Sequence, residues 1–398
     1  MNFTPKTAKQ ILGNPDYLAI SYGGYRGATR ERQPSLEELK EDLRILHAMG
    51  IRILRTYNLQ LPHSPNILKA IKEIQERDAD FEMYVMLGAW IDCKNAWTQQ
   101  QPNHNLENTE NNSSEIAKAI TLANQYPDIV KIIAVGNEAM VHWATSYFVS
   151  PVIILKWVSY LQKQKKEGNL PESLWITSSD NFASWGGGGQ EYHNKDLEKL
   201  VAAVDYISMH TYPFHDTHYN PNFWKVPPQE SSGTEIEIIE KAMQRALGYA
   251  TNQYESVKKY VASLGVKKPI HIGETGWATT SWGLYGPNGS NAADQYKQAL
   301  YYKLMRQWSA NNNITCFFFE AFDEQWKDPT QANGSENHFG LFTIDGQAKY
   351  ALWPLVDQGI FRGLTRDQNP IKKTFNGDLE LLITEVFTPK PAIPHSQN

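Results

Sequence analysis

Two stretches of the sequence decide its fold: IIAVGNE at residues 132–138 and IHIGETGW at residues 270–277. Each is an apolar run typical of a buried strand, and each then presents a glutamate, Glu138 or Glu274. In a barrel of alternating strands and helices, reactive groups lie at the carboxyl ends of the strands. We therefore expect both glutamates at the mouth of such a barrel.

Strand-like runs recur along the chain and alternate with helix-like stretches. The expected strands cover residues 18–23, 51–57, 81–90, 130–138, 174–178, 204–210, 269–273 and 314–322. Helices are expected from Ser35 to Gly50 and over 115–124, 153–166, 236–263 and 294–310. Ser35 and Glu38 have the spacing of a capping box. Eight strands separated by helices predict an α/β fold, a single (β/α)₈ TIM barrel, rather than a doubly wound sheet.

The ends of the chain and two internal stretches are expected to lie outside the barrel strands. The barrel should occupy residues 16–364, after an N-terminal extension (1–15) and before a C-terminal extension and tail (365–398). Residues 388–398 read as a frayed tail. The polar, Asn- and Gln-rich stretch 99–114 predicts an exposed insertion. Gly186–Gly189 predicts a mobile or tightly turning loop.

Charge and hydropathy exclude several classes of partner. The formal net charge is -5 and the pI about 6.1, which argues against nucleic acid and against an anionic membrane surface. The sequence has no apolar run long enough to span a membrane. Its first residues lack the features of a secretory signal, which leaves a cytoplasmic protein or a mature secreted form. We expect a monomer in an extracytoplasmic compartment.

Cysteines give little information about compartment. Cys93 and Cys316 are the only two, so they cannot build a disulfide framework or a cysteine-rich metal site. Cys316 lies in an apolar run and is expected to be a buried small hydrophobe. A single disulfide between the two is the minor alternative.

Glu138 and Glu274 are the expected catalytic pair. They follow the fourth and seventh strands, which should place them on opposite walls of the mouth. Two carboxyl groups about 5–5.5 Å apart, one protonated and one ionised, cleave glycosidic bonds with retention of configuration. The alternative is that each is an ordinary surface acid at a strand end, and that alternative weakens when two such acids share the pattern.

Three motifs resemble those of glycoside hydrolase family 17, the β-1,3-glucanase and glucanosyltransferase family. VGNE at 135–138 resembles the acid/base motif of that family, and GETGW at 273–277 resembles its nucleophile motif. FEAFDEQWK at 319–327 resembles its last strand and the loop that follows. The family usually has proline after the motif tryptophan, where this chain has Ala278. The resemblance covers residues 16–360.

The resemblance implies a cofactor-free, metal-free glycosidase that acts by double displacement on β-1,3-glucan of the laminarin type. Glu274 would be the nucleophile and Glu138 the acid/base, while Asn137 would bond the sugar 2-hydroxyl. Transfer of the glycosyl group to another glucan at the same site is one alternative. A non-catalytic glucan-binding barrel is another.

Other residues are expected around the sugar. Tyr212 ends the sixth strand, where it either orients Glu274 or is an ordinary rim tyrosine, and Tyr57 ends the second strand. Glu324 and Lys327 resemble the acid and base of the family near its sugar subsites, with a surface ion pair as the alternative. Five tryptophans just past strand ends are either stacking platforms for glucose or packing residues: Trp143, Trp185, Trp277, Trp282 and Trp326.

A histidine cluster offers a different class of enzyme. His210, His215 and His218, with Asp216, would suit a metal-dependent hydrolase, but they lack a helical His-x-x-x-His or glutamate-bearing zinc motif. Nucleotide binding is disfavoured as well. The glycine run is followed by Gln190, rather than by the lysine of a phosphate-binding loop.

Overall fold

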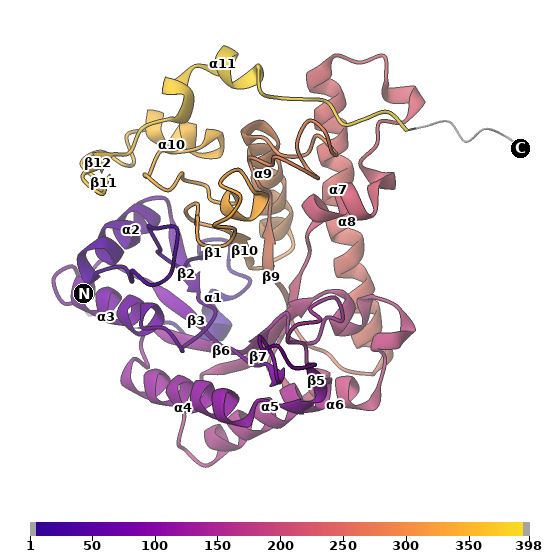
Figure 1. The fold of residues 1–398 in the computed structure, drawn as a ribbon. Coiled ribbons are helices and arrows are strands. Elements are labelled where there is room, and N and C mark those ends of the chain that lie inside the picture. Colours follow the sequence, from indigo (N-terminus) through magenta and orange to yellow (C-terminus); the bar gives the residue numbers. More distant parts are fainter. Residues whose placement is uncertain (1–4, 393–398) are drawn as a thin grey trace, which may run out of the picture.

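Eight parallel strands close into a barrel in the computed structural model, which describes residues 5–392 (Figure 1). The strands follow one another around the barrel in chain order, and the last pairs with the first. They are β1 (Leu18–Ser21), β2 (Ile51–Arg55), β3 (Tyr84–Ala89), β6 (Val130–Asn137), β7 (Trp175–Asn181), β8 (Ile207–His210), β9 (Ile270–Gly276) and β10 (Cys316–Phe319). The predicted (β/α)₈ barrel is confirmed.

Helices surround the barrel. The longer ones are α2 (Leu36–Ala48), α3 (His63–Gln75), α4 (Thr109–Gln125), α5 (Pro151–Lys166), α6 (Lys195–Ala203), α8 (Glu235–Ser263) and α9 (Gln295–Asn311). The shorter ones are α1 (Ala8–Ile11), α7 (Pro213–Tyr219), α10 (Trp353–Asp357) and α11 (Leu379–Ile383). The capping box predicted at Ser35 and Glu38 is present at the start of α2. Two small hairpins add β4 (Cys93–Lys94) with β5 (Asn103–Glu107), and β11 (Thr365–Arg366) with β12 (Asn369–Pro370).

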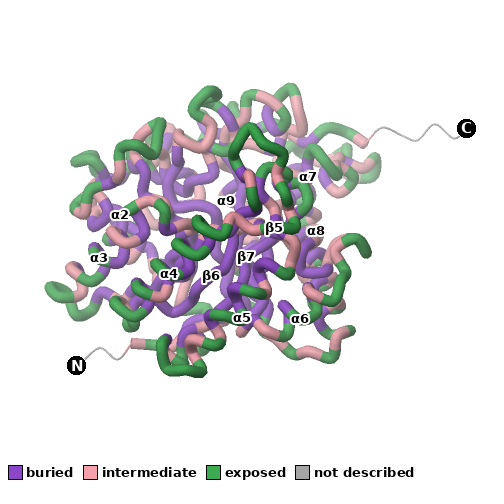
Figure 2. The backbone as a smooth tube through the Cα atoms, turned by 60° about the horizontal axis from the view of Figure 1, so that its bottom comes forward, coloured by how far each residue is buried: buried purple, intermediate pink, exposed green. Residues whose placement is uncertain are grey.

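The core has two parts, and the difference between them positions the site. A large apolar core lies between the strands and the helices, and Figure 2 shows the strands buried at the centre of the molecule. A second cluster combines apolar side chains of the strands with Ala8 and Ile11 of α1. The N-terminal helix therefore packs onto the interior of the barrel. The polar residues that follow the strands lie at the carboxyl end of the barrel.

Two predicted irregular stretches are ordered. Residues 99–114 are largely exposed, as predicted, but they are folded, because they contain β5 and the start of α4, which the side chain of Asn108 caps by accepting from the Asn111 N–H. The glycine run is a tight turn rather than a mobile loop. Gly186 has φ +84°, and a Cβ there would lie 2.1 Å from the ring of Tyr260, so only glycine fits.

The C-terminal segment is bonded to the body of the protein as far as it is described. The Val226 N–H donates to the carbonyl of Lys390, and the Ala392 N–H donates back to Val226. The predicted fraying is therefore wrong for residues 388–392, while residues 1–4 and 393–398 of the predicted extensions lie outside the described part. Cys93 and Cys316 are both buried and both free thiols. Within residues 5–392, no helix has the length and apolar character needed to cross a membrane.

Candidate active site

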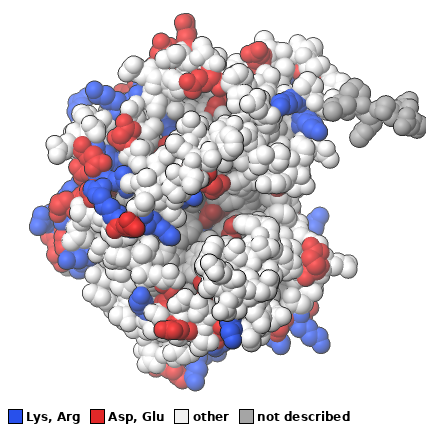
Figure 3. Space-filling model, in the orientation of Figure 1, with Lys and Arg blue, Asp and Glu red and all other residues white. Residues whose placement is uncertain are grey.

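Glu138 directly follows β6, and Glu274 lies near the carboxyl end of β9. The face of the molecule seen in Figure 3 has a central hollow. Acidic side chains are visible inside this hollow (Figure 3). Two strands, β7 and β8, separate β6 from β9 on one side of the barrel and four strands separate them on the other, so the two glutamates lie across the mouth from each other. The side chain of Arg55 bonds both Glu274 and Asn137, the residue before Glu138. One arginine thus joins the two motifs in a single site.

Three donors hold the carboxylate of Glu274. The Tyr212 hydroxyl donates to Oε1 at 2.6 Å, and the Tyr57 hydroxyl donates to Oε2 at 2.7 Å. Arg55 Nη1 also donates to Oε2, at 2.5 Å. Each donor stabilises the ionised form.

The pKa of Glu274 is held at about 2. Burial alone would raise it, but His210, Arg55 and the two tyrosine hydrogen bonds lower it further than burial raises it. Burial lowers the pKa of His210 itself to about 4, so at neutral pH Arg55 is the cation that acts. Glu274 is therefore ionised at neutral pH and suited to be a nucleophile.

The backbone conformation at Glu138 sets the direction of its side chain. It has φ +45°, in the left-handed region, and its N–H donates to the carbonyl of Ser179 on β7 at 2.9 Å. Its Oε1 lies 3.1 Å from Nδ1 of His210, whose Nε2 lies 2.8 Å from the Ser179 hydroxyl. A strained main chain fixed by a neighbouring strand is typical of functional sites.

Burial raises the pKa of Glu138 to about 8, and the negative charge of Glu274 adds to the shift. Glu138 is therefore protonated at neutral pH, while Glu274 is not. This difference is the arrangement that an acid and a nucleophile require.

Arg55 is the functional residue that the sequence reading missed. It is completely buried within β2, and it donates from Nη2 to Oδ1 of Asn137 at 2.5 Å. That bond makes Oδ1 the acceptor, so the amide nitrogen of Asn137 is the group that remains to donate to a substrate. The available signal was an arginine inside an apolar strand, since a buried cation needs a buried acid.

Glu324 and Lys327 belong to a buried network, so the surface ion-pair alternative is wrong. Only 3% of the surface of Glu324 is exposed. Lys327 Nζ lies 2.5 Å from Oε1 of Glu320 and 3.5 Å from Oε2 of Glu324. The indole N–H of Trp326 donates to the same Glu324 oxygen at 2.8 Å. This network follows β10 at the barrel mouth.

The tryptophans divide into two groups. Trp277 and Trp185 have no exposed surface, and their indole N–H groups donate to the carbonyls of Ala292 and Ser208. They are packing residues, so the prediction that Trp277 stacks on a sugar is wrong. Its ring lies among Phe214, Trp224 and Tyr301. Trp143 and Trp282 are each 61% exposed and keep an available ring, whereas Trp326 is half-buried, with the guanidinium of Arg30 4.2 Å from its ring centroid.

The histidines that suggested zinc have other partners. His210 uses its ring nitrogens toward Glu138 and Ser179, and His215 Nδ1 lies 3.1 Å from the hydroxyl of Tyr285. Over residues 5–392, His, Cys, Asp and Glu side chains form no group of three or more that could hold a metal ion.

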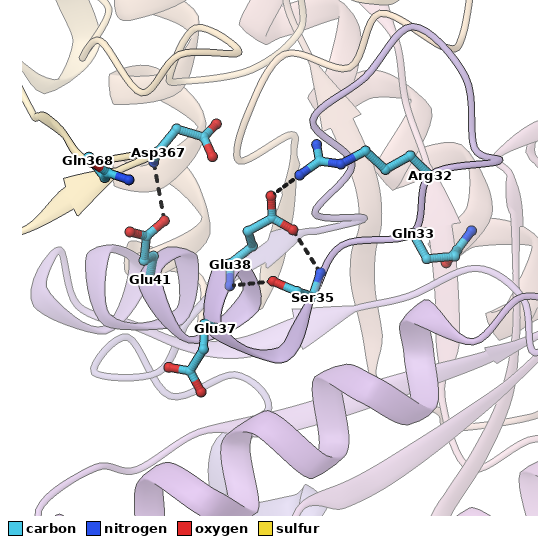
Figure 4. Close-up of a pocket in the computed structure, with 8 residues that line it drawn as sticks. All are labelled: Arg32, Gln33, Ser35, Glu37, Glu38, Glu41, Asp367 and Gln368. Carbon is cyan, nitrogen blue, oxygen red and sulfur yellow. Dashed lines mark hydrogen bonds and ion pairs between the residues drawn. The ribbon is translucent and has the colours of Figure 1, made fainter.

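A second hollow lies away from the glutamates (Figure 4). It has a volume of about 390 Å³ and lies between the start of α2 and the β11–β12 turn. Its charges already pair with one another: Arg32 with Glu38, which also closes the capping box, and Glu41 with the N–H of Asp367. Nothing in this hollow resembles the catalytic pair.

Comparison with known proteins gives consistent matches. Residues 19–340 match the family described as the BtgE/BtgC glycoside hydrolase domain. An endo-laminarinase from Formosa Hel1_33_131 is 62% identical, with a TM-score of 0.97 over 99% of this chain and 100% of that one. A family 17 β-1,3-glucanosyltransferase from Rhizomucor miehei is 19% identical, with a TM-score of 0.58 over 84% and 96%, and so shows the fold alone.

Curated relatives are more distant or match over shorter segments. A probable glucan endo-1,3-beta-glucosidase, btgC, of Aspergillus flavus is 22% identical over 88% of this chain and 46% of its own length. A glucan 1,3-beta-glucosidase of Candida albicans is 38% identical over 20% of this chain and 25% of its own. The chain thus spans less than half the length of these two proteins.

Proposed function

Because the chain belongs to the BtgE/BtgC glycoside hydrolase family, in line with its resemblance to glycoside hydrolase family 17, we propose that it hydrolyses internal bonds of β-1,3-glucan with retention of configuration. The observation that carries this proposal is the pair of buried glutamates at one site: three donors hold the carboxylate of Glu274 and lower its pKa, while burial and the charge of Glu274 raise the pKa of Glu138. The likeness to an endo-laminarinase over nearly the whole chain supports the substrate.

The reaction has two displacements at one sugar. Glu274 attacks the anomeric carbon as the glycosidic C–O bond breaks, and Glu138 gives its proton to the departing oxygen. Glu138, now ionised, removes a proton from water, which attacks the same carbon and releases Glu274. Two inversions give net retention.

The neighbours of the pair position it. Tyr212, Tyr57 and Arg55 hold the Glu274 carboxylate in one orientation, and this removes part of the entropy cost of attack. Asn137 is placed to donate its amide to the sugar 2-hydroxyl, a contact that strengthens in the transition state.

The sugar chain extends from the cleavage point over the rim of the barrel. Glu324 and Lys327 would bond hydroxyl groups, and the rings of Trp326 and Trp282 would stack on glucose faces. Polymeric glucan does not cross a bilayer, so we expect the protein to act outside the cytoplasm. We also expect it to act as a monomer.

Digestion of linear β-1,3-gluco-oligosaccharides tests the proposal. Chromatography should reveal shorter oligosaccharides, and proton NMR should detect the β-anomer first. An α-anomer as first product would exclude retention, and binding without cleavage would favour the glucan-binding barrel.

The same digestion separates the remaining alternatives. Transfer to a second glucan uses the same glycosyl-enzyme, and it would appear as products longer than the substrate. A metal-dependent hydrolase would lose activity in EDTA, whereas the two-carboxylate mechanism keeps it.

A further inference from the structure

An exposed tryptophan stands on the rim of the barrel, and no step of the proposed reaction uses it. Trp97 lies in the turn between β4 and β5 and leaves 62% of its surface exposed. Its main chain has φ +62°, in the left-handed region that bulky residues avoid. The turn is nevertheless closed, because the N–H of the buried Ala96 donates to the carbonyl of Cys93.

The ring of Trp97 is held in place by other aromatic rings. It stacks on Tyr147, with the centroids 5.0 Å apart and the planes 20° apart. Tyr147 in turn packs against Trp90, the residue after β3, at 5.1 Å. The hairpin follows β3 and the Tyr147 loop follows β6, so both lie at the carboxyl end of the barrel. The exposed ring therefore has a fixed position among the loops at the carboxyl end of the barrel.

This aromatic stack belongs to the acid/base side of the site. Tyr147 lies in the loop that begins directly after Glu138, and the Val149 N–H ties that loop back by donating to the carbonyl of Ala139 at 2.7 Å. The Cys93 N–H donates to the carbonyl of Tyr147 at 3.1 Å, which joins the hairpin to the same loop. The residues that hold Glu274 come from elsewhere: Arg55 ends β2, Tyr57 lies just past β2, and Tyr212 lies just past β8.

The tryptophans with a structural role have a different environment from Trp97. Trp185 and Trp277 are completely buried, and each donates its indole N–H to a carbonyl. Trp97 has an unfavourable backbone conformation, and its ring is exposed to solvent. A purely structural role does not explain this combination. A flat, rigid and exposed ring is what stacks on the C–H face of a pyranose.

We propose that Trp97, supported by Tyr147, is a stacking platform for a glucosyl residue on the leaving-group side of the cleavage point. The inference rests on the proposed function, because the acid protonates the departing oxygen and the departing sugars therefore lie on its side. Water replaces these sugars before the second displacement. In a transfer reaction, the accepting glucan would occupy the same platform.

Two substrates separate this role from general damage to the site. A linear β-1,3-glucoheptaose has sugars on both sides of the cleaved bond, whereas β-laminaribiosyl fluoride has none on the leaving-group side. Trp97→Ala should lower kcat/KM about tenfold on the heptaose, the size of a lost aromatic stacking contact. It should leave kcat/KM on the fluoride unchanged. Trp97→Phe should restore most of the loss.

A matched control is available on the outer surface. Tyr160 of α5 is 42% exposed and lies on a helix outside the barrel, so Tyr160→Ala should change neither rate. Equal loss on both substrates in Trp97→Ala, loss on the fluoride alone, or no loss on either would overturn the platform. Failure of the unaltered protein to cleave the heptaose would instead overturn the proposed function.

Discussion

Glu138 and Glu274 are the same amino acid, both at the carboxyl ends of strands, yet their surroundings drive them in opposite directions. Burial raises the pKa of both. Around Glu274, the charge of Arg55 and the hydrogen bonds of two tyrosine hydroxyls oppose that effect and hold the pKa below its ordinary value. Around Glu138, the hydrogen-bond partner is a histidine that is neutral at neutral pH, and the largest charge effect is that of Glu274, so the pKa stays at about 8.

The comparison teaches that donors, rather than burial, assign the two roles. Oε2 of Glu274 accepts from a cation and from a phenol, and Oε1 accepts from a second phenol. Among the described residues, the side chain of Glu138 has a single side-chain hydrogen-bond partner, His210. The proton therefore stays on the carboxyl group with the weaker support.

Removal of the nucleophile should have the largest effect. Glu274→Gln keeps the size and most hydrogen bonds of the side chain but cannot form the glycosyl-enzyme. We expect kcat to fall on the order of 10⁵-fold, as when other hydrolases lose their nucleophile. Calorimetry should find glucan binding nearly unchanged. Retained turnover would take the nucleophile role away from Glu274.

Removal of the acid should have a smaller and substrate-dependent effect. Glu138→Ala should lower kcat on glucan by about 10²–10⁴-fold, the usual contribution of general acid–base catalysis. A glycosyl fluoride, whose leaving group needs little protonation, should lose far less in the first step. Added azide should then restore turnover and yield a β-glycosyl azide. Without such rescue, the assignment of Glu138 as the acid/base does not stand.

Removing one hydrogen bond to Glu274 should lower kcat/KM by an amount that depends on which donors the affected oxygen retains. Tyr212→Phe leaves Oε1 without its donor, and a bond to a charged group contributes about 1.5–3 kcal/mol, so kcat/KM should fall about 10- to 100-fold. Tyr57→Phe should cost less, because Arg55 still serves Oε2. Steady-state kinetics on one oligosaccharide checks the ranking. Equal losses of kcat/KM in Tyr212→Phe and Tyr57→Phe would mean that the two carboxylate oxygens of Glu274 do not differ in their support.

The pH dependence of kcat/KM should be the smallest of the predicted effects. Glu138 acts as the acid only while protonated, so kcat/KM should fall as the pH rises through about 8. Because the charge of Glu274 adds to this shift, the pKa of Glu138 should decrease in Glu274→Gln, as followed by ¹³C NMR of the carboxyl carbon. A basic limb near the ordinary value of glutamate, about 4.3, would contradict the comparison.

The sequence predicted the features that follow from local order along the chain, namely the strands and the residues at their ends. Eight strands and two glutamates at strand ends are visible as local patterns, because each strand must bury apolar side chains before it presents a polar one. The same logic placed Tyr212 at the end of β8, and its hydroxyl does reach Glu274. Even the start of α2 was readable from Ser35 and Glu38.

What the sequence left out depends on which way a side chain points in three dimensions. Trp277 follows the nucleophile strand directly, yet its ring packs behind the strand against Phe214 of α7. Arg55 looked like one of two arginines in a mainly apolar strand, and its partner is 219 residues away. Trp97 lay in a stretch without apolar periodicity, and only the stack on Tyr147 makes it visible as a rigid ring.

That long separation has a consequence for how the protein is made. When β2 leaves the ribosome, the carboxylate that will neutralise Arg55 has not yet been synthesised, and β10, which closes the ring onto β1, comes later still. A guanidinium buried without its acid is strongly unfavourable, so the early half of the chain cannot reach its final packing alone. Synthesis of the nucleophile strand thus both completes the catalytic site and permits the first strands to assemble.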